Sequence, residues 1–111
     1  MKQEDRKAAV RGYKEREVEA GIYAVRCAPS AQVWVGSAPD LSTIRNRIWF
    51  TLRQGRNTHR ALQQAWNEHG EGAFAFEILE RLGEEDSGLA RERVLKSLRL
   101  DWTERLGALR L

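Results

Sequence analysis

The sequence has few of the residues that hold small proteins together through covalent or metal links. Its 111 residues include one cysteine, Cys27, so an internal disulfide is excluded, and no Cys/His spacing typical of a zinc site is present. Long apolar runs are also missing: residues 1–5 are polar, and no stretch approaches bilayer length. We therefore expect a cytoplasmic protein without a signal peptide or membrane segment, stabilised by one hydrophobic core.

Acidic residues are absent from one long stretch. The net charge is only +3, but no Asp or Glu occurs between Asp40 and Glu68. The basic residues of that stretch are all arginines, namely Arg45, Arg47, Arg53, Arg56 and Arg60. Because a guanidinium binds phosphate through two hydrogen bonds, this segment favours contact with a polyanion. A solvated helix face is the alternative.

Two β-prone segments predict an antiparallel hairpin. Residues 22–27 and 32–35 are rich in β-branched and aromatic side chains, and a short turn at 28–31 separates them. Alternation along the first strand places two sets of side chains on opposite faces, Tyr23, Val25 and Cys27 on one and Ile22, Ala24 and Arg26 on the other.

Two helices are predicted after the hairpin. Asp40 can cap the first, which ends at Gly55, and Thr58 can cap the second, which ends at Gly70. Their apolar positions recur at helical spacing, with Leu41, Ile44, Ile48 and Leu52 in the first and Leu62, Ala65 and Trp66 in the second.

The remaining segments complete an α/β (α+β) pattern. Alternation over residues 74–79 predicts a third strand, and a cap region at 84–87 precedes a last helix. Charged residues 1–20 predict an N-terminal helix in front of a single domain over 21–111. The buried stripe of the last helix is formed by Leu95, Leu98, Trp102 and Leu106.

Two short motifs, together with the segments that follow them along the chain, resemble a known family. Residues 21–23 read Gly-Ile-Tyr, and residues 34–37 read Trp-Val-Gly-Ser. Residues 57–59 (Asn-Thr-His) and 62–70, which end in His-Gly, follow in the expected order. The chain therefore resembles the GIY-YIG nucleases, and most of all their phage homing endonucleases. The resemblance implies a three-stranded antiparallel sheet flanked by helices, to which this chain adds an N-terminal helix.

The resemblance also implies an activity. Members of the family are DNA endonucleases that hydrolyse a phosphodiester with one divalent metal ion, Mg²⁺ or Mn²⁺. A hard cation with oxygen ligands lowers the pKa of a bound water, and an arginine neutralises the charge of the transition state. The alternative for this chain is a nucleic-acid-binding module on the same fold that has lost cleavage.

Two motif positions of the family bear tyrosines. The first corresponds to Tyr23, which the resemblance assigns to activation of the metal-bound water. The second holds Trp34, whose indole offers one N–H donor and no ionisable proton. Trp34 can orient a phosphate or water, or it can pack in the core.

The arginine that binds the scissile phosphate in the family corresponds to Ile44, and Ile48 follows one turn later. Arg45 or Arg47 can take its role, and the spacing does not choose between them. The residues expected to contact nucleic acid are Arg45, Arg47, Arg53, Arg56, Arg60 and His59.

The metal ligand of the family is a glutamate on the last helix. An ungapped alignment arrives at Arg93, and Glu92 directly precedes it. Glu92 lies three residues before Leu95, so helical geometry turns it toward the buried stripe. We therefore expect Glu92 to be the ligand. An asparagine that the family often places beyond this helix has no counterpart, because no asparagine follows Glu92.

Overall fold

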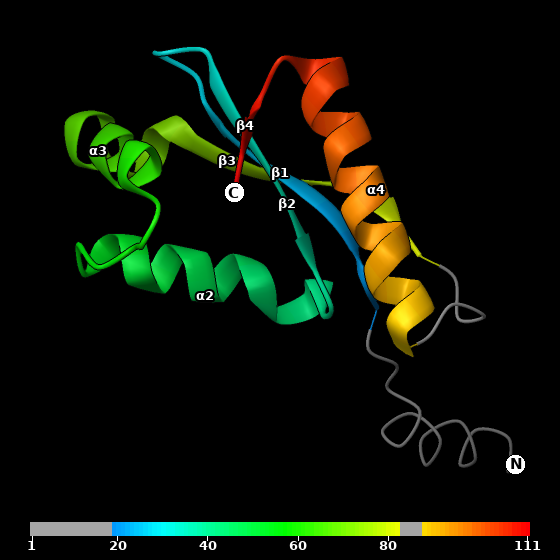
Figure 1. Cartoon of the computed structure of the whole chain (residues 1–111). Coiled ribbons are helices and arrows are strands. Elements are labelled where there is room, and N and C mark those ends of the chain that lie inside the picture. The colour runs from blue at the N-terminus through cyan, green and yellow to red at the C-terminus, as the bar shows by residue number, and fades with distance from the viewer. Residues whose placement is uncertain (1–18, 83–87) are drawn as a thin grey trace, which may run out of the picture.

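The computed structural model describes residues 19–82 and 88–111. Within them, the order is β1, β2, α2, α3, β3, α4 and β4, with a short 3-10 helix, η1, before β3 (Figure 1). The predicted N-terminal helix falls almost wholly on residues 1–18, and the predicted cap region at 84–87 falls on the second gap, so both lie outside the described residues.

The sheet has the strand order β3-β1-β2-β4. Strand β1 (Gly21–Cys27) pairs antiparallel with β2 (Gln32–Ala38) on one side and with β3 (Phe74–Arg81) on the other. This confirms the three strands expected from the sequence. The prediction of a purely antiparallel sheet of three strands is wrong, because β4 (Leu109–Arg110) pairs parallel with β2.

The sequence did not predict β4, because a strand of two residues is too short to show an alternating pattern. It forms after α4 ends and Gly107, with φ of +60°, turns the chain back along β2. The amide of Leu111 then donates to the carbonyl of Val35 at 2.9 Å. The far end of β2, at 36–38, pairs with β1 on one side only, as far as the described strands show.

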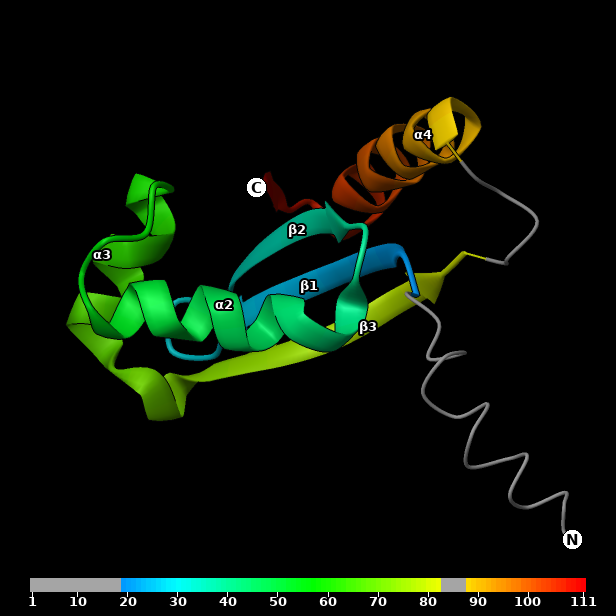
Figure 2. The same ribbon diagram turned by 90° about the horizontal axis from the view of Figure 1, so that it is seen from below.

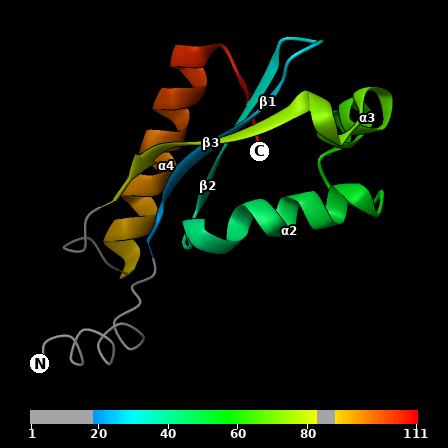
Figure 3. The ribbon, with the colours of Figure 1, turned by 180° about the vertical axis from the view of Figure 1, so that it is seen from behind.

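Helices cover both faces of the sheet. α2 (Leu41–Arg53) and α3 (Arg60–His69) lie on one side, and α4 (Gly88–Leu106) lies on the other (Figures 2 and 3). The 3-10 helix η1 (Glu71–Ala73) joins α3 to β3. Among the described helices, none has a stretch both long and apolar enough to span a bilayer.

Helix caps agree with the sequence at one end and differ at another. The carboxylate of Asp40 accepts from the N–H of Ser42 at 3.0 Å, which confirms Asp40 as the cap of α2. The cap of α3 is His59 rather than the predicted Thr58. The reason lies in the preceding loop: the side chain of Asn57 accepts from the amide of His59 at 2.8 Å, so the helix starts one residue later.

The predicted alternation of β1 is confirmed by two separate apolar clusters. Tyr23, Val25 and Cys27 join α2 and α3, whereas Ile22 and Ala24 join α4. Trp49 adds to the expected stripe of α2 and meets Trp66 of α3 edge to face at 5.6 Å. The expected stripe of α4 packs against the second cluster through Leu95, Leu98, Trp102 and Leu106.

Candidate active site

Tyr23 is the centre of the candidate site. It is 5% exposed and lies directly across from Gly36 in the β1–β2 register. A Cβ added to Gly36 would lie 2.5 Å from Tyr23 Oη and 2.7 Å from Cζ. Phe76 stacks on the ring with centroids 5.3 Å apart. The phenol therefore lies against the bare backbone of Gly36, and Leu111 Cβ lies 3.2 Å from the same added Cβ.

Burial makes the Tyr23 hydroxyl a weaker acid than an exposed tyrosine. It raises the pKa of Tyr23 to about 12, while the charges of Arg99 and Arg47 act in the opposite direction. At neutral pH the hydroxyl is protonated and can donate a hydrogen bond. Arg99 belongs to α4 and Arg47 to α2, so cations from both sides of the sheet act on this one group.

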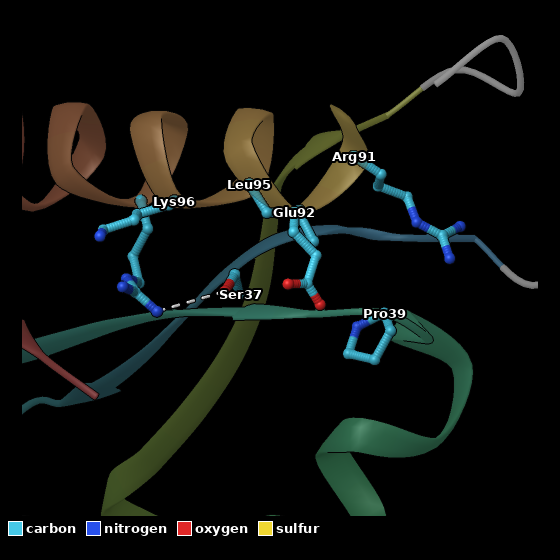
Figure 4. Close-up of a pocket in the computed structure, with 7 residues that line it drawn as sticks. Ser37, Pro39, Arg91, Glu92, Leu95 and Lys96 are labelled. Carbon is cyan, nitrogen blue, oxygen red and sulfur yellow. Dashed lines mark hydrogen bonds between the residues drawn. The ribbon is translucent and has the colours of Figure 1, made fainter. Parts of the chain in front are cut away.

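An open pocket of about 650 Å³ lies between α4 and the end of β2 (Figure 4). Ser37 and Pro39 form its β2 side. The side chain of Glu92 projects from α4 toward β2, between the positions of these two residues (Figure 4). The α4 side of the pocket is formed by Arg91, Glu92, Leu95, Lys96 and Arg99.

The structure separates the two candidate arginines of α2. The guanidinium of Arg45 lies over the ring of Trp49, 5.3 Å from its centroid. The pKa of Glu71 is lowered by its hydrogen bond to Arg53 and, to a smaller extent, by the charge of Arg45. The charge of Arg45 thus acts on Glu71 of η1, whereas that of Arg47 acts on Tyr23.

Ile44 and Ile48 belong to the packed side of α2. Ile48 is buried in the cluster shared by α2, α3 and the sheet, and Ile44 packs against that cluster. The helix face that carries the phosphate-binding arginine in the family is therefore apolar here, and any cation at the site must come from a flanking position.

Trp34 lies in the core. Its side chain has no exposed surface, and its ring stacks on Phe74 with centroids 6.2 Å apart. The indole Nε1 is buried and has no hydrogen-bond partner in the described part of the chain. This placement favours packing over contact with a substrate.

The remaining residues expected to contact nucleic acid are spread over the loop and helix after α2. Arg53 forms a two-bond ion pair with Glu71, at 3.0 and 2.8 Å. Arg56 donates to Gln54 at 3.3 Å. Arg60 is exposed at the start of α3. Apart from Arg53, these arginines carry no ion pair with a described carboxylate.

His59 ties α3 to the C-terminal strand. Its Nδ1 accepts from the amide of Leu62 at 3.4 Å, so the proton of the neutral ring lies on Nε2. Nε2 then donates to the carbonyl of Arg110 at 3.1 Å. Both ring nitrogens are thus engaged in holding the fold.

Arg99 is a candidate site residue that the sequence analysis did not include. Its Nη1 lies 3.5 Å from Ser37 Oγ, and its charge acts on Tyr23. A signal was available: Arg99 follows Glu92 by seven residues, about two helical turns, so both side chains share one face of α4.

The site offers little to a metal ion on its own. The described ranges contain no group of three or more His, Cys, Asp or Glu side chains that could hold one. Mg²⁺ is nevertheless commonly held by one or two carboxylates, with waters and substrate phosphates completing its shell. The Glu92 carboxylate has no hydrogen bond or ion pair with another described residue. It therefore fits as the single protein ligand of such an ion.

Comparison with known proteins gives matches among solved structures alone. No protein-family model and no curated protein matches the sequence. One similar structure, the catalytic domain of the homing endonuclease I-TevI, has a TM-score of 0.70 and 25% identity over 83% of this chain and 97% of that one. A mutant of the intron endonuclease I-TevI catalytic domain has a TM-score of 0.68 and 27% identity over 80% and 84%. The chain thus resembles the catalytic domain of a GIY-YIG homing endonuclease.

Proposed function

We propose that the protein is a divalent-metal-dependent DNA endonuclease. Its active site would lie at the β2 edge, which here means residues 36–38, the part of β2 that does not pair with β4. The observation that carries this proposal is the position of Arg99, which lines the same pocket as Glu92 and whose charge, like that of Arg47, acts on the Tyr23 phenol. Tyr23 comes from β1, Arg47 from α2, and Glu92 from α4, so three separate elements supply groups of different chemistry. The likeness to an endonuclease catalytic domain supports the same reading.

Each group has a role that its chemistry allows. Arg47 would neutralise charge on the phosphate as the transition state forms. The protonated hydroxyl of Tyr23 would donate a hydrogen bond to an oxygen of the reacting groups. Glu92 would hold Mg²⁺ or Mn²⁺, which when bound lowers the pKa of a coordinated water and screens the phosphate.

The proposed substrate follows from the distribution of charge. The segment between Asp40 and Glu68 has no carboxylate and carries its arginines on α2, the following loop and α3. Arg47, Arg56 and Arg60 are exposed on it. A nucleic-acid backbone passing over this segment would reach Tyr23 from the α2 side. Such binding should weaken steeply as the salt concentration rises.

A second function has specific support. Ile44 and Ile48 are packed where the family carries polar groups, and Trp34 is buried away from solvent. These three positions favour a nucleic-acid-binding module that retains the arginines and has lost cleavage. The two functions share the same surface and differ in whether a bond is broken.

A cleavage assay separates them. Single-stranded, duplex and branched DNA, and RNA, would be incubated with the protein in Mg²⁺, in Mn²⁺ and in EDTA. For an endonuclease, cleavage requires the metal and falls by a factor on the order of 10²–10³ in Glu92→Gln. Glu104→Gln is the matched control, because Glu104 lies on α4 outside the lining of the pocket.

The outcomes of this assay are distinct. Cleavage that persists in EDTA, or that is unchanged in both Glu92→Gln and Tyr23→Phe, would rule out the proposed site. Salt-dependent binding of DNA without cleavage in either metal would favour the module. Neither binding nor cleavage of any of the four substrates would remove both functions.

A further inference from the structure

Four arginines of the described residues lie on the surface, and each pairs with a carboxylate. The pairs are Arg26–Glu77, Arg53–Glu71, Arg81–Glu19 and Arg105–Asp101. Arg99 differs: it is half-buried, and no carboxylate of the described residues lies within ion-pair distance of it. A cation removed from water in this way requires an anion or further acceptors.

The hydrogen bonds of Arg99 point to the same need. Its Nε is buried and has no acceptor among the described residues. Its Nη1 reaches Ser37 Oγ at 3.5 Å, the long limit of a hydrogen bond. Buried donors of charged groups are rarely left without a partner, and such an orphan donor calls for an explanation. The guanidinium therefore has donors available for a ligand.

The surroundings of Arg99 select an anionic ligand. Among the residues that the structure describes, Arg91, Lys96 and Arg99 line the pocket as cations, and Glu92 lines it as the one acidic residue. With a divalent ion on Glu92 the excess of positive charge would grow further. A guanidinium fits an oxyanion with two oxygens in its plane, which is the geometry of a phosphodiester.

The position of Arg99 connects this pocket to Tyr23. The charges of Arg99 and Arg47 both act on the Tyr23 hydroxyl, one from α4 and the other from α2. The family places its phosphate-binding arginine on the helix that is α2 here, at a position that Ile44 occupies and packs. A phosphate beside Tyr23 can still be held by an arginine that arrives from the opposite side of β2.

We propose that Arg99, half-buried on α4 beside Ser37 in the pocket that Glu92 also lines, is the residue that binds the substrate phosphate of this site. The proposal rests on the proposed function in one respect, that a nucleic-acid backbone enters at the β2 edge. Ser37 is a positioning residue, since its hydroxyl lies against the guanidinium. Arg47 supplies the second charge from the α2 side.

Binding without metal tests the proposal independently of cleavage. A short fluorescent oligothymidylate would be titrated by anisotropy in EDTA at several salt concentrations. Arg99→Met should weaken binding about 10-fold and lower the slope of log K against log salt by about one. Arg99→Lys should recover part of the affinity because it keeps the charge and loses the two-bond geometry. Arg105→Met is the control, since Arg105 lies on the same helix and pairs with Asp101.

The wild-type protein provides a readout that no substitution can disturb. The Nε–H resonance of Arg99 should shift on addition of the oligothymidylate, and that of Arg105 should stay in place. Far-ultraviolet circular dichroism of each variant shows whether it has folded. An Arg99→Met protein that is folded and binds like Arg105→Met, with an unchanged salt slope, would overturn the proposal, as would an Arg99 resonance that does not move.

Failure of this proposal is distinct from failure of the proposed function. Metal-dependent cleavage at the wild-type rate in Arg99→Met would leave the nuclease intact and remove Arg99 from the site. Loss of binding in Arg99→Met, together with no cleavage by the wild type, would keep Arg99 as a phosphate ligand of a binding module.

Discussion

Tyr23 and Gly36 face each other across the β1–β2 hairpin, and the phenol of one occupies the space that a side chain on the other would need. The Cβ of any residue at 36 would lie 2.5 Å from the hydroxyl oxygen, well inside contact distance. The two short motifs at 21–23 and 34–37 therefore form one structural unit. The second motif provides the space, and the first provides the group that fills it.

Replacing Gly36 tests this relationship. Gly36→Ala should lower the free energy of unfolding by about 1–3 kcal/mol, because the new methyl group and the Tyr23 ring cannot both keep their places. Urea unfolding at neutral pH measures the change. The cost should shrink when Tyr23 is also replaced by alanine, since the clashing ring is gone.

Gly72→Ala is the matched control for that substitution. Nothing lies within 4 Å of a Cβ built at Gly72, so the change should stay within about 0.5 kcal/mol. An equal cost of Gly36→Ala with and without the Tyr23 side chain would show that the ring is not the cause.

The raised pKa of Tyr23 predicts a loss of stability in alkali. The unfolded tyrosine loses its proton near pH 10 and the folded one near pH 12. Between these values the folded state binds more protons than the unfolded state, so stability falls as pH rises. The contribution is full below about pH 10 and declines by up to about 3 kcal/mol by pH 12.

Tyr23→Phe isolates this contribution from other groups that titrate in the same range. Urea unfolding of both proteins at pH 8, 10 and 11 gives the difference in slope. The wild type should lose stability more steeply above pH 10 than the phenylalanine variant. Parallel curves would show that Tyr23 has an ordinary pKa.

Periodicity in the sequence was sufficient for most of the fold. Strand alternation placed Tyr23 and Ile22 on opposite faces, and helical spacing placed Leu95 in the core. The features that periodicity did not predict depend on contacts beyond the local sequence pattern. β4 exists because the chain returns along β2, and His59 caps α3 in a loop fixed by Asn57.

The site was predictable in part for a similar reason. Tyr23 and Glu92 followed from motif and helical spacing, although their roles stay predictions. Arg45 and Arg47 are two residues apart and point about 200° apart around α2, so the choice between them required the position of Tyr23. Arg99 has no sequence signal except its spacing from Glu92, because a half-buried arginine looks like a solvated one.

The separation of Arg45 from Arg47 gives a third prediction. Arg47→Gln should weaken DNA binding several-fold and reduce any metal-dependent cleavage by a factor on the order of 10²–10³, because its charge acts at Tyr23. Arg45→Gln removes a charge that lies over Trp49 and acts on Glu71 instead of Tyr23. Its effect on cleavage should stay within a few-fold.

Steady-state cleavage and anisotropy, measured side by side for the two variants, decide this point. A larger defect in Arg45→Gln than in Arg47→Gln would mean that the substrate approaches along the side of α2 on which Arg45 lies over Trp49. That result would move the binding surface toward Glu71 and away from the β2 edge.

The Arg53–Glu71 ion pair gives a fourth prediction, in which a substitution strengthens DNA binding instead of weakening it. Both side chains are about half exposed, so the pair contributes little to stability. It does occupy the guanidinium of Arg53 through two hydrogen bonds. Glu71→Gln should therefore release Arg53 for phosphate, strengthen DNA binding a few-fold, and steepen the salt dependence by about 0.7–0.9 in the log–log slope.

The double variant Arg53→Gln/Glu71→Gln shows whether Arg53 is the source of the gain. If it is, the second substitution cancels the first, and both the affinity and the salt slope return toward the wild-type values. A gain that survives in the double variant would come from the lost carboxylate alone, through weaker repulsion of the DNA backbone. In that case Arg53 would be a structural partner of η1 rather than a contact to nucleic acid, and the binding surface would be confined to the arginines that have no carboxylate beside them.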